Sequence, residues 1–239
     1  KDLITEAGKA FGNFQKMLRN FPADALYETI PNFHNTVKRF TDLFHSLIDD
    51  DSDRAKSAKE ELTYLIDNRF NAESLCTMLG NDEIPLRVTH NDTKCNNVLF
   101  DMDTGKSLAV IDLDTVMPGL VAYDFGDAVR SICSLTNEDE TDLDKVCFDL
   151  NGFEAFTKGF LSQVKDVLTE KEKKSLTLAP YAITCELSSR FLEDYLRGDK
   201  YFKINYPLHN FDRAKCQIAL AKDIAKKQEK ITEIIKKYA

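Results

Sequence analysis

The sequence lacks a long hydrophobic run, a surplus of basic residues and a paired cysteine motif. No apolar stretch approaches the ~18–20 residues that a membrane-spanning helix needs, and the longest, such as Ser107–Ile111, have the length of a strand. The 32 Lys and Arg residues are outnumbered by 40 Asp and Glu residues, which gives a formal net charge of −8. Without a basic surplus to bind phosphates or anionic lipids, we expect neither a nucleic-acid partner nor a membrane partner.

The six cysteines are scattered, and no two of them form a C-x-x-C pair. The chain opens with Lys-Asp-Leu-Ile-Thr and not with the basic and apolar segments of a secretory signal. Together these features favour reduced thiols and a cytoplasmic location. Because the first residue is not Met and an amphipathic helix follows at once, we expect the chain to be one part of a longer protein.

The first third of the chain has the periodicity of helices. Apolar side chains that recur at steps of three and four residues share one helical face. The first such stripe consists of Ala7, Phe11, Phe14, Leu18 and Phe21. A second stripe consists of Phe33, Val37, Phe40, Phe44 and Ile48. A third helix is expected from Ser52 or Asp53 to about Leu75.

The pattern changes at Ile84, where short β-branched runs replace the helical period. Three strands are expected, at residues 86–89, 97–101 and 108–112, with a hairpin turn at Met102–Gly105 between the last two. Helices return after Leu143, with one expected over 177–197, which Gly198 ends, and another over 211–238. The sequence therefore predicts an α+β, mostly helical fold with a small β-hairpin insert.

The densest polar cluster of the chain lies in this β segment. His90 and Asp92 follow the first short strand, and Asn97 completes the spacing H-x-D-x-x-x-x-N. This is the pattern of kinase catalytic loops, in which the Asp orients the attacking hydroxyl and the Asn amide oxygen holds Mg²⁺ on the nucleotide phosphates. Asp112, at the end of the last short strand, is placed to complete the metal site. We expect His90 to orient the loop and not to bind metal.

Three segments resemble the aminoglycoside phosphotransferase and choline kinase-like superfamily, namely Val88–Asp101, Val110–Asp114 and Tyr123–Arg130. Other stretches are similar to its N-acetylhexosamine 1-kinase branch: I-D-L-D-T-V-M-P-G from Ile111, and the segments 185–192 and 209–213. The resemblance covers nearly the whole chain and implies the C-terminal lobe of a protein-kinase-like fold.

The resemblance also implies roles for individual residues. Asp92 would be the catalytic aspartate, and Asn97 and Asp112 would be the magnesium ligands. Asp124 would brace the loop. Asp114 lies two residues after Asp112, on the same face of an extended strand, and could share or replace its role as a ligand.

Two further residues, Glu186 and Arg190, are predicted to contact the acceptor. They are one helical turn apart, so both could face the same cleft. A surface ion pair between them explains the spacing nearly as well.

One part of the kinase pattern is missing. A kinase also needs a loop that covers the phosphates and a strand Lys that contacts them, both supplied by a β-rich N-terminal lobe. Nothing before residue 84 resembles such a lobe. We therefore interpret residues 1–239 as the C-terminal catalytic and acceptor-binding lobe, with the nucleotide-gripping lobe absent from this chain. We expect the chain alone to be inactive.

The sequence thus predicts a phosphotransferase that uses ATP and Mg²⁺ to phosphorylate a sugar hydroxyl, with the anomeric hydroxyl of an N-acetylhexosamine as the first choice. Choline, homoserine or an aminoglycoside stays open as the acceptor, and the acidic runs at 49–53 and 137–144 would suit a cationic one. Two other classes stay open. One is a metal-dependent hydrolase with His90, Asp92 and Asp112 as ligands, and the other is a non-catalytic binding module with a kinase-like core.

Overall fold

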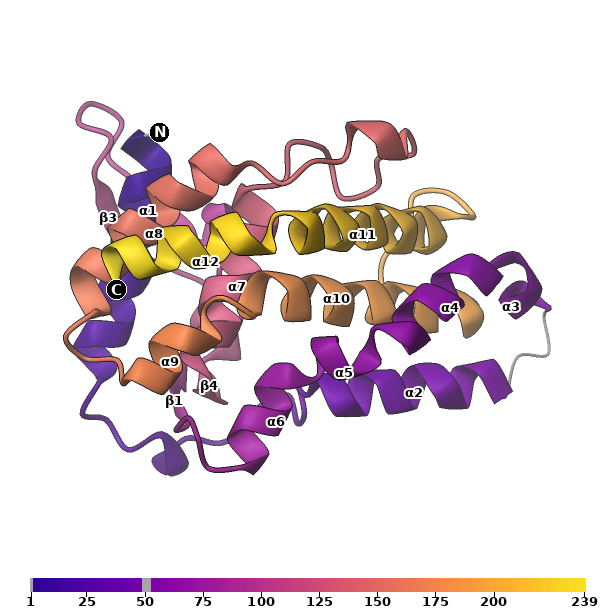
Figure 1. The fold of residues 1–239 in the computed structure, drawn as a ribbon, viewed down its shortest axis with the longest axis horizontal. Helices are drawn as coiled ribbons and strands as arrows, with labels where there is room; N and C mark the ends of the chain where they lie inside the picture. The colour runs from indigo at the N-terminus through magenta and orange to yellow at the C-terminus, as the bar shows by residue number, and fades with distance from the viewer. Residues whose placement is uncertain (1, 49–52) are drawn as a thin grey trace.

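The computed structural model describes residues 2–48 and 53–239, and most of these are helical (Figure 1). The acidic run at 49–53, and with it Ser52 as a helix start, therefore falls almost wholly outside the described residues. The first third holds α1 (Asp2–Leu18), α2 (Thr36–Ile48), α3 (Arg54–Ser57), α4 (Lys59–Asp67), α5 (Arg69–Ala72) and α6 (Ser74–Gly80). The rest holds α7 (Val121–Ile132), α8 (Leu150–Val164), α9 (Glu170–Ser175), α10 (Ala179–Leu196), α11 (His209–Lys226) and α12 (Gln228–Tyr238).

Among the described residues, four short strands form two antiparallel pairs near the middle of the sequence. The predicted hairpin is confirmed: β2 (Val98–Phe100) pairs with β3 (Ser107–Val110), and Gly105 in the turn has φ +67°. The predicted first strand is β1 (Arg87–Thr89), and it pairs with a strand that the sequence did not indicate, β4 (Met117–Gly119). The segment between β3 and β4 therefore crosses from one pair to the other.

The core is built around α10, which packs against α2, α7 and α11. Figure 1 shows α10 lying between α11 and α2. A helix that is covered on several sides buries its polar residues as well, and Glu186 and Asp194 are 1% and 3% exposed. Buried carboxylates need partners, so α10 ties neighbouring segments to the core by hydrogen bonds as well as by apolar contact.

Helices α1 and α8 approach each other so closely that glycine is required at the contact. A Cβ atom added to Gly8 would lie 2.3 Å from the backbone oxygen of Phe156, and one added to Gly159 would lie 2.1 Å from that of Thr5. Both distances are far below ordinary van der Waals contact. The backbone of α1 therefore has a fixed position on α8, and α1 in turn packs against β1, β3 and α7.

The helical predictions differ from the structure in three places. α2 begins only at Thr36, after Phe33, and of the predicted stripe Phe40 is fully buried whereas Val37 and Ile48 are 37% and 80% exposed. The single helix expected up to Leu75 is divided into α3, α4, α5 and α6, and the last predicted helix is divided at Lys227. The fold class is confirmed as mostly helical. Within the described residues no helix is both long and apolar enough to cross a membrane.

Candidate active site

The segment after β1 turns sharply and presents Asp92 at the surface. Asn91 has φ +66°, a left-handed conformation that Asn tolerates better than most residues. The Nδ2 group of Asn97 donates to the backbone oxygen of Asp92 at 2.8 Å and to its Oδ2 at 3.2 Å. Lys94 Nζ lies 2.8 Å from Asp92 Oδ1, and the Asp92 side chain is 25% exposed. The loop thus fixes a solvent-accessible carboxylate with an amide on one oxygen and a cation on the other.

The back of this loop is held by Asp124, in the first turn of α7. Its Oδ2 accepts from the His90 N–H at 2.9 Å and its Oδ1 from the Asn91 N–H at 2.7 Å. Gln15 of α1 donates to Oδ2 at 2.6 Å. Burial raises the pKa of Asp124 despite these hydrogen bonds, which favour the charged form. One side chain therefore fixes two successive peptide groups just before Asp92.

Asp127, one turn further along α7, holds the other side of the loop. Its Oδ2 accepts from the Thr93 N–H at 2.9 Å, and its Oδ1 lies 3.0 Å from Nη2 of Arg130. Burial alone would raise the pKa of Asp127, but Arg130 and other cations keep it below its usual value. Backbone groups on both sides of Asp92 are thus bound to one helix.

His90 uses both ring nitrogens within the chain. Nε2 lies 2.9 Å from the backbone oxygen of Ile111, which can only accept, so Nε2 carries a proton. Nδ1 accepts from the Asp92 N–H at 3.3 Å. The ring packs edge-on against Phe11 and Phe14, with centroids 5.9 and 5.7 Å away. His90 is a neutral imidazole that links the loop to the β3 end, and neither nitrogen is left for a metal ion.

The β2–β3 hairpin brings Asp112 to the same region. Ile111 N–H donates to the backbone oxygen of Asn97 at 2.9 Å, so Asp112 lies one residue beyond the point where the two segments meet. Asp112 has φ +63° and is exposed, and a single turn of 3-10 helix follows at 113–115. The extended strand that would place Asp114 on the same face as Asp112 is therefore wrong, because β3 ends at Val110.

The side-chain oxygens of Asn97 and Asp112 are the kind of ligand that a hard cation prefers. No group of three or more His, Cys, Asp or Glu side chains in the described part of the chain could hold a metal ion. Asn97 turns its Nδ2 group toward Asp92, so these bonds do not engage its amide oxygen. That oxygen and the Asp112 carboxylate suit Mg²⁺, which in nucleotide-dependent sites takes one or two carboxylates and completes its shell with phosphates and water.

Glu186 and Arg190 do not form the joint open face that their spacing suggests. The Glu186 Oε1 lies 2.8 Å from Nδ1 of His34, and its Oε2 accepts from Thr36 Oγ1 at 2.7 Å. The guanidinium of Arg190 instead lies over the ring of Phe33, 5.2 Å from its centroid. Glu186 is thus fully occupied inside the protein. The role of Arg190 in acceptor binding stays a prediction.

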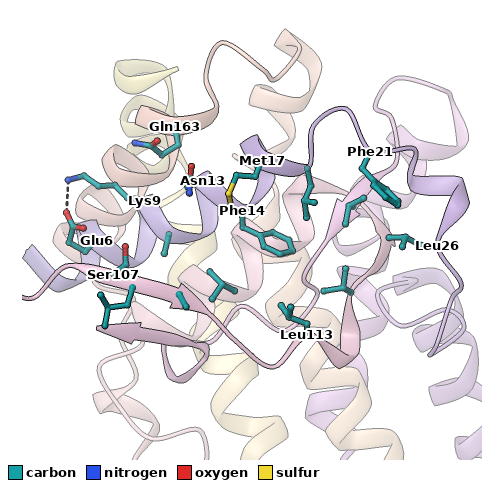
Figure 2. A pocket seen from close by; sticks show the side chains of 17 residues that line it. Glu6, Lys9, Asn13, Phe14, Met17, Phe21, Leu26, Ser107, Leu113 and Gln163 are labelled. Carbon is teal, nitrogen blue, oxygen red and sulfur yellow. Dashed lines mark hydrogen bonds and ion pairs between the residues drawn. The ribbon is translucent and has the colours of Figure 1, made fainter. Parts of the chain in front are cut away.

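An apolar groove of about 780 Å³ lies beside the loop, between α1 and β3. Figure 2 shows Phe14, Met17, Phe21, Leu26 and Leu113 around it. Met17 is 67% exposed although it is apolar. The side chains of Asp92, Asn97 and Asp112 are not part of its lining, so the groove adjoins the candidate site without containing it.

Comparison with known proteins shows the family and the fold of this chain. A model of the phosphotransferase enzyme family matches residues 2–156, which include the loop, the hairpin and α7. The chain belongs to this phosphotransferase family. Its fold is also similar to that of an ethanolamine kinase from Plasmodium vivax, with a TM-score of 0.57 and 16% sequence identity, over 89% of this chain. The match covers 59% of that kinase, and the phosphotransferase fold here corresponds to the C-terminal lobe of a kinase-like fold.

Sequence reasoning missed four residues that hold or flank this loop: Gln15, His34, Lys94 and Asp127. Lys94 stands two residues after Asp92, so a search for cations inside the motif finds it. Gln15 bonds to Asp124, which is 109 residues away in the sequence, and His34 bonds to Asn91 of the loop, which is 57 residues away. No local pattern marks such contacts.

Proposed function

We propose that this chain is the C-terminal lobe of a small-molecule kinase, which transfers the terminal phosphoryl group of ATP to a hydroxyl group. The first choice of acceptor is the anomeric hydroxyl of an N-acetylhexosamine. The observation that carries the proposal is the Asp92 carboxylate, which stays open to solvent while Asp124 and Asp127 fix the backbone on both sides of it. Phosphoryl transfer requires mainly positioning and charge stabilisation, and a rigid carboxylate provides the first.

In this mechanism Asp92 accepts a hydrogen bond from the acceptor hydroxyl and takes up its proton as the phosphoryl group transfers. Lys94, 2.8 Å from Asp92, adds positive charge where the phosphoryl oxygens arrive. Asn97 and Asp112 would hold Mg²⁺, which neutralises charge on the nucleotide phosphates when it is bound. Neither His90 nor Asp124 touches the substrates, since both are occupied in holding the loop.

The same proposal assigns the nucleotide grip to a second lobe outside residues 1–239. The apolar groove supports this assignment, because the surface of a complete folded protein rarely exposes so many large apolar side chains next to one another. Leu108 of β3 and Leu113 after it, 66% and 54% exposed, both line this groove. A second lobe packed there would cover them and would place the nucleotide next to Asp112.

Two rival classes fit less well. A hydrolase that binds its metal through His90 needs a free ring nitrogen, and both nitrogens of His90 are bonded within the chain. A non-catalytic binding module has no need of a partly exposed Asp92 beside a cation and an amide. The acceptor is less restricted, and ethanolamine joins choline, homoserine and the aminoglycosides as a cationic alternative.

The test is ATP consumption by the full-length protein that contains this chain, with Mg²⁺ and a panel of N-acetylhexosamines, plain hexoses, ethanolamine, choline, homoserine and an aminoglycoside. We expect turnover on N-acetylhexosamines, and Asp92→Asn should lower kcat by about 10²–10⁴-fold. Asp67→Asn, on the exposed side of α4, is the matched control and should leave kcat unchanged.

Turnover on another acceptor alone would keep the mechanism and reject the sugar. A folded protein without turnover on the whole panel would reject the proposed function. Asp112→Asn and Asp114→Asn, titrated with Mg²⁺, decide the ligand, since only the true ligand should raise the Mg²⁺ concentration needed for half-maximal rate.

A further inference from the structure

The peptide group that links Asn91 to Asp92 is held at both ends by histidine rings. Its oxygen lies 3.0 Å from Nε2 of His34, and its N–H donates to Nδ1 of His90 at 3.3 Å. His34 lies in the segment before α2, and its ring is 57 residues away from Asn91 in the sequence. We name this pair of rings the histidine clamp.

The two rings of the clamp must differ in protonation. His90 accepts at Nδ1 and donates at Nε2, as a neutral imidazole does. His34 faces two acceptors, because Nε2 meets the Asn91 carbonyl oxygen and Nδ1 meets Glu186 Oε1 at 2.8 Å. Two acceptors require two N–H groups, so His34 satisfies both partners only as an imidazolium.

The surroundings of His34 favour that charge. Burial alone would lower the pKa of His34, but the charge and hydrogen bond of Glu186, with a smaller contribution from Asp127 of α7, raise it above its usual value. Glu186 is itself held in its charged form by His34 and by the hydroxyl of Thr36, which keep its pKa low against the effect of burial. Other titratable or charged groups around the pair are Tyr123 of α7, with Cys76 of α6 behind it, and the guanidinium groups of Arg190 and Arg39, which interact with Glu186.

We propose that His34, held as an imidazolium by Glu186, is a positioning residue that fixes the plane of the Asn91–Asp92 peptide group and so aims the Asp92 carboxylate. Asp124 fixes the N–H groups of His90 and Asn91, but it makes no bond to the next peptide group. The clamp supplies that last constraint. The inference rests on the proposed function only in that Asp92 acts on the acceptor.

The charge of His34 is tested first, on the unaltered full-length protein labelled with ¹⁵N-histidine. Ring nitrogen spectra near neutral pH should show two protonated nitrogens for His34 and one for His90, with signals assigned by the loss of one set in His34→Gln. His90 serves as the internal control, because it lies on the same peptide group. A neutral His34 at this pH would overturn the proposal.

Kinetics test the positioning role. His34→Gln should lower kcat by about 10²-fold, the typical result of misplacing a catalytic group, with the KM for ATP and for the acceptor nearly unchanged. Glu186→Gln keeps the shape but removes the charge, so its kcat should fall at a lower pH than that of the unaltered protein. His45→Gln, on the exposed side of α2, is the matched control with an unaltered profile.

The outcomes separate the two proposals. If Asp92→Asn abolishes turnover while His34→Gln and Glu186→Gln leave kcat and its pH profile unchanged, the clamp is rejected and the proposed function stands. If Asp92→Asn is also without effect, the proposed function fails and with it the positioning role. If His34→Gln does not fold, the spectra and the pH profile of Glu186→Gln decide.

Discussion

The two sides of the loop that carries Asp92 differ in how fully the rest of the chain covers and binds them. At the back, Asp124, Asp127 and His34 bind successive backbone groups in a buried network. At the front, Met17 and Leu108 remain exposed around an apolar groove. The chain therefore fixes the backbone around Asp92 by itself, and under the proposed function a second lobe would cover the neighbouring apolar surface.

The back of the loop should be the most sensitive to substitution. Asp124→Ala leaves the N–H groups of His90 and Asn91 buried without an acceptor, each at about 1–3 kcal/mol, so we expect a loss of about 2–6 kcal/mol in the free energy of unfolding. Urea titration of the full-length protein measures it. Asp67→Ala is the control and should stay within about 0.5 kcal/mol. A loss below about 1 kcal/mol would mean that the network does not hold the loop.

Substitutions in the apolar groove should lower the stability only of a protein in which a second lobe covers the groove. Met17→Ser should change the stability of this chain alone by less than about 0.5 kcal/mol, because the side chain is exposed. In the full-length protein the same change should cost about 1.5–3 kcal/mol, the usual value of a buried Met side chain. Urea titration of both proteins gives the two values. Equal small effects in both would show that nothing packs on the groove.

The smallest effect expected is a dependence of stability on pH. Since the pKa of His34 is raised in the folded state, its contribution is complete below about pH 6.5 and is lost as the pH rises through the folded value. The free energy of unfolding should therefore fall in that window, by up to about 1.4 kcal/mol per pH unit for one proton. Glu186→Gln should reduce the slope of the free energy of unfolding against pH in this window. An unchanged slope would mean that the His34–Glu186 pair does not cause it.

The sequence predicts features that depend on neighbouring residues and does not predict contacts between segments far apart in the chain. The spacing of His90, Asp92 and Asn97 and the turn before Gly105 are local patterns, and they lead directly to the loop and the hairpin. β4 is missed because Pro118 at its centre removes a backbone donor, which argues against a strand. It pairs nonetheless, since Gly119 lets the backbone approach Thr89, where a Cβ atom would lie 2.3 Å from Oγ1.

The role of Glu186 could not be predicted for a different reason. Its helical spacing from Arg190 is real, but spacing within one helix says nothing about which other segment covers it. His34 reaches Glu186 across 152 residues, and that contact exists only once α2 has packed against α10. Polar residues of a helix that is covered on several sides are therefore poor guides to a binding surface.

The close glycine contact between α1 and α8 makes the position of the loop depend on residues that are far from it in the sequence. Helix α1 carries Phe14 and Gln15, which hold the loop, and Met17, which lines the groove. Because a Cβ atom on Gly159 would lie 2.1 Å from the backbone oxygen of Thr5, even Gly159→Ala would force α1 to shift, and the loop would shift with it. The two helices can therefore change only together. A substitution at their contact, far from Asp92 in the sequence, would displace the loop that carries Asp92.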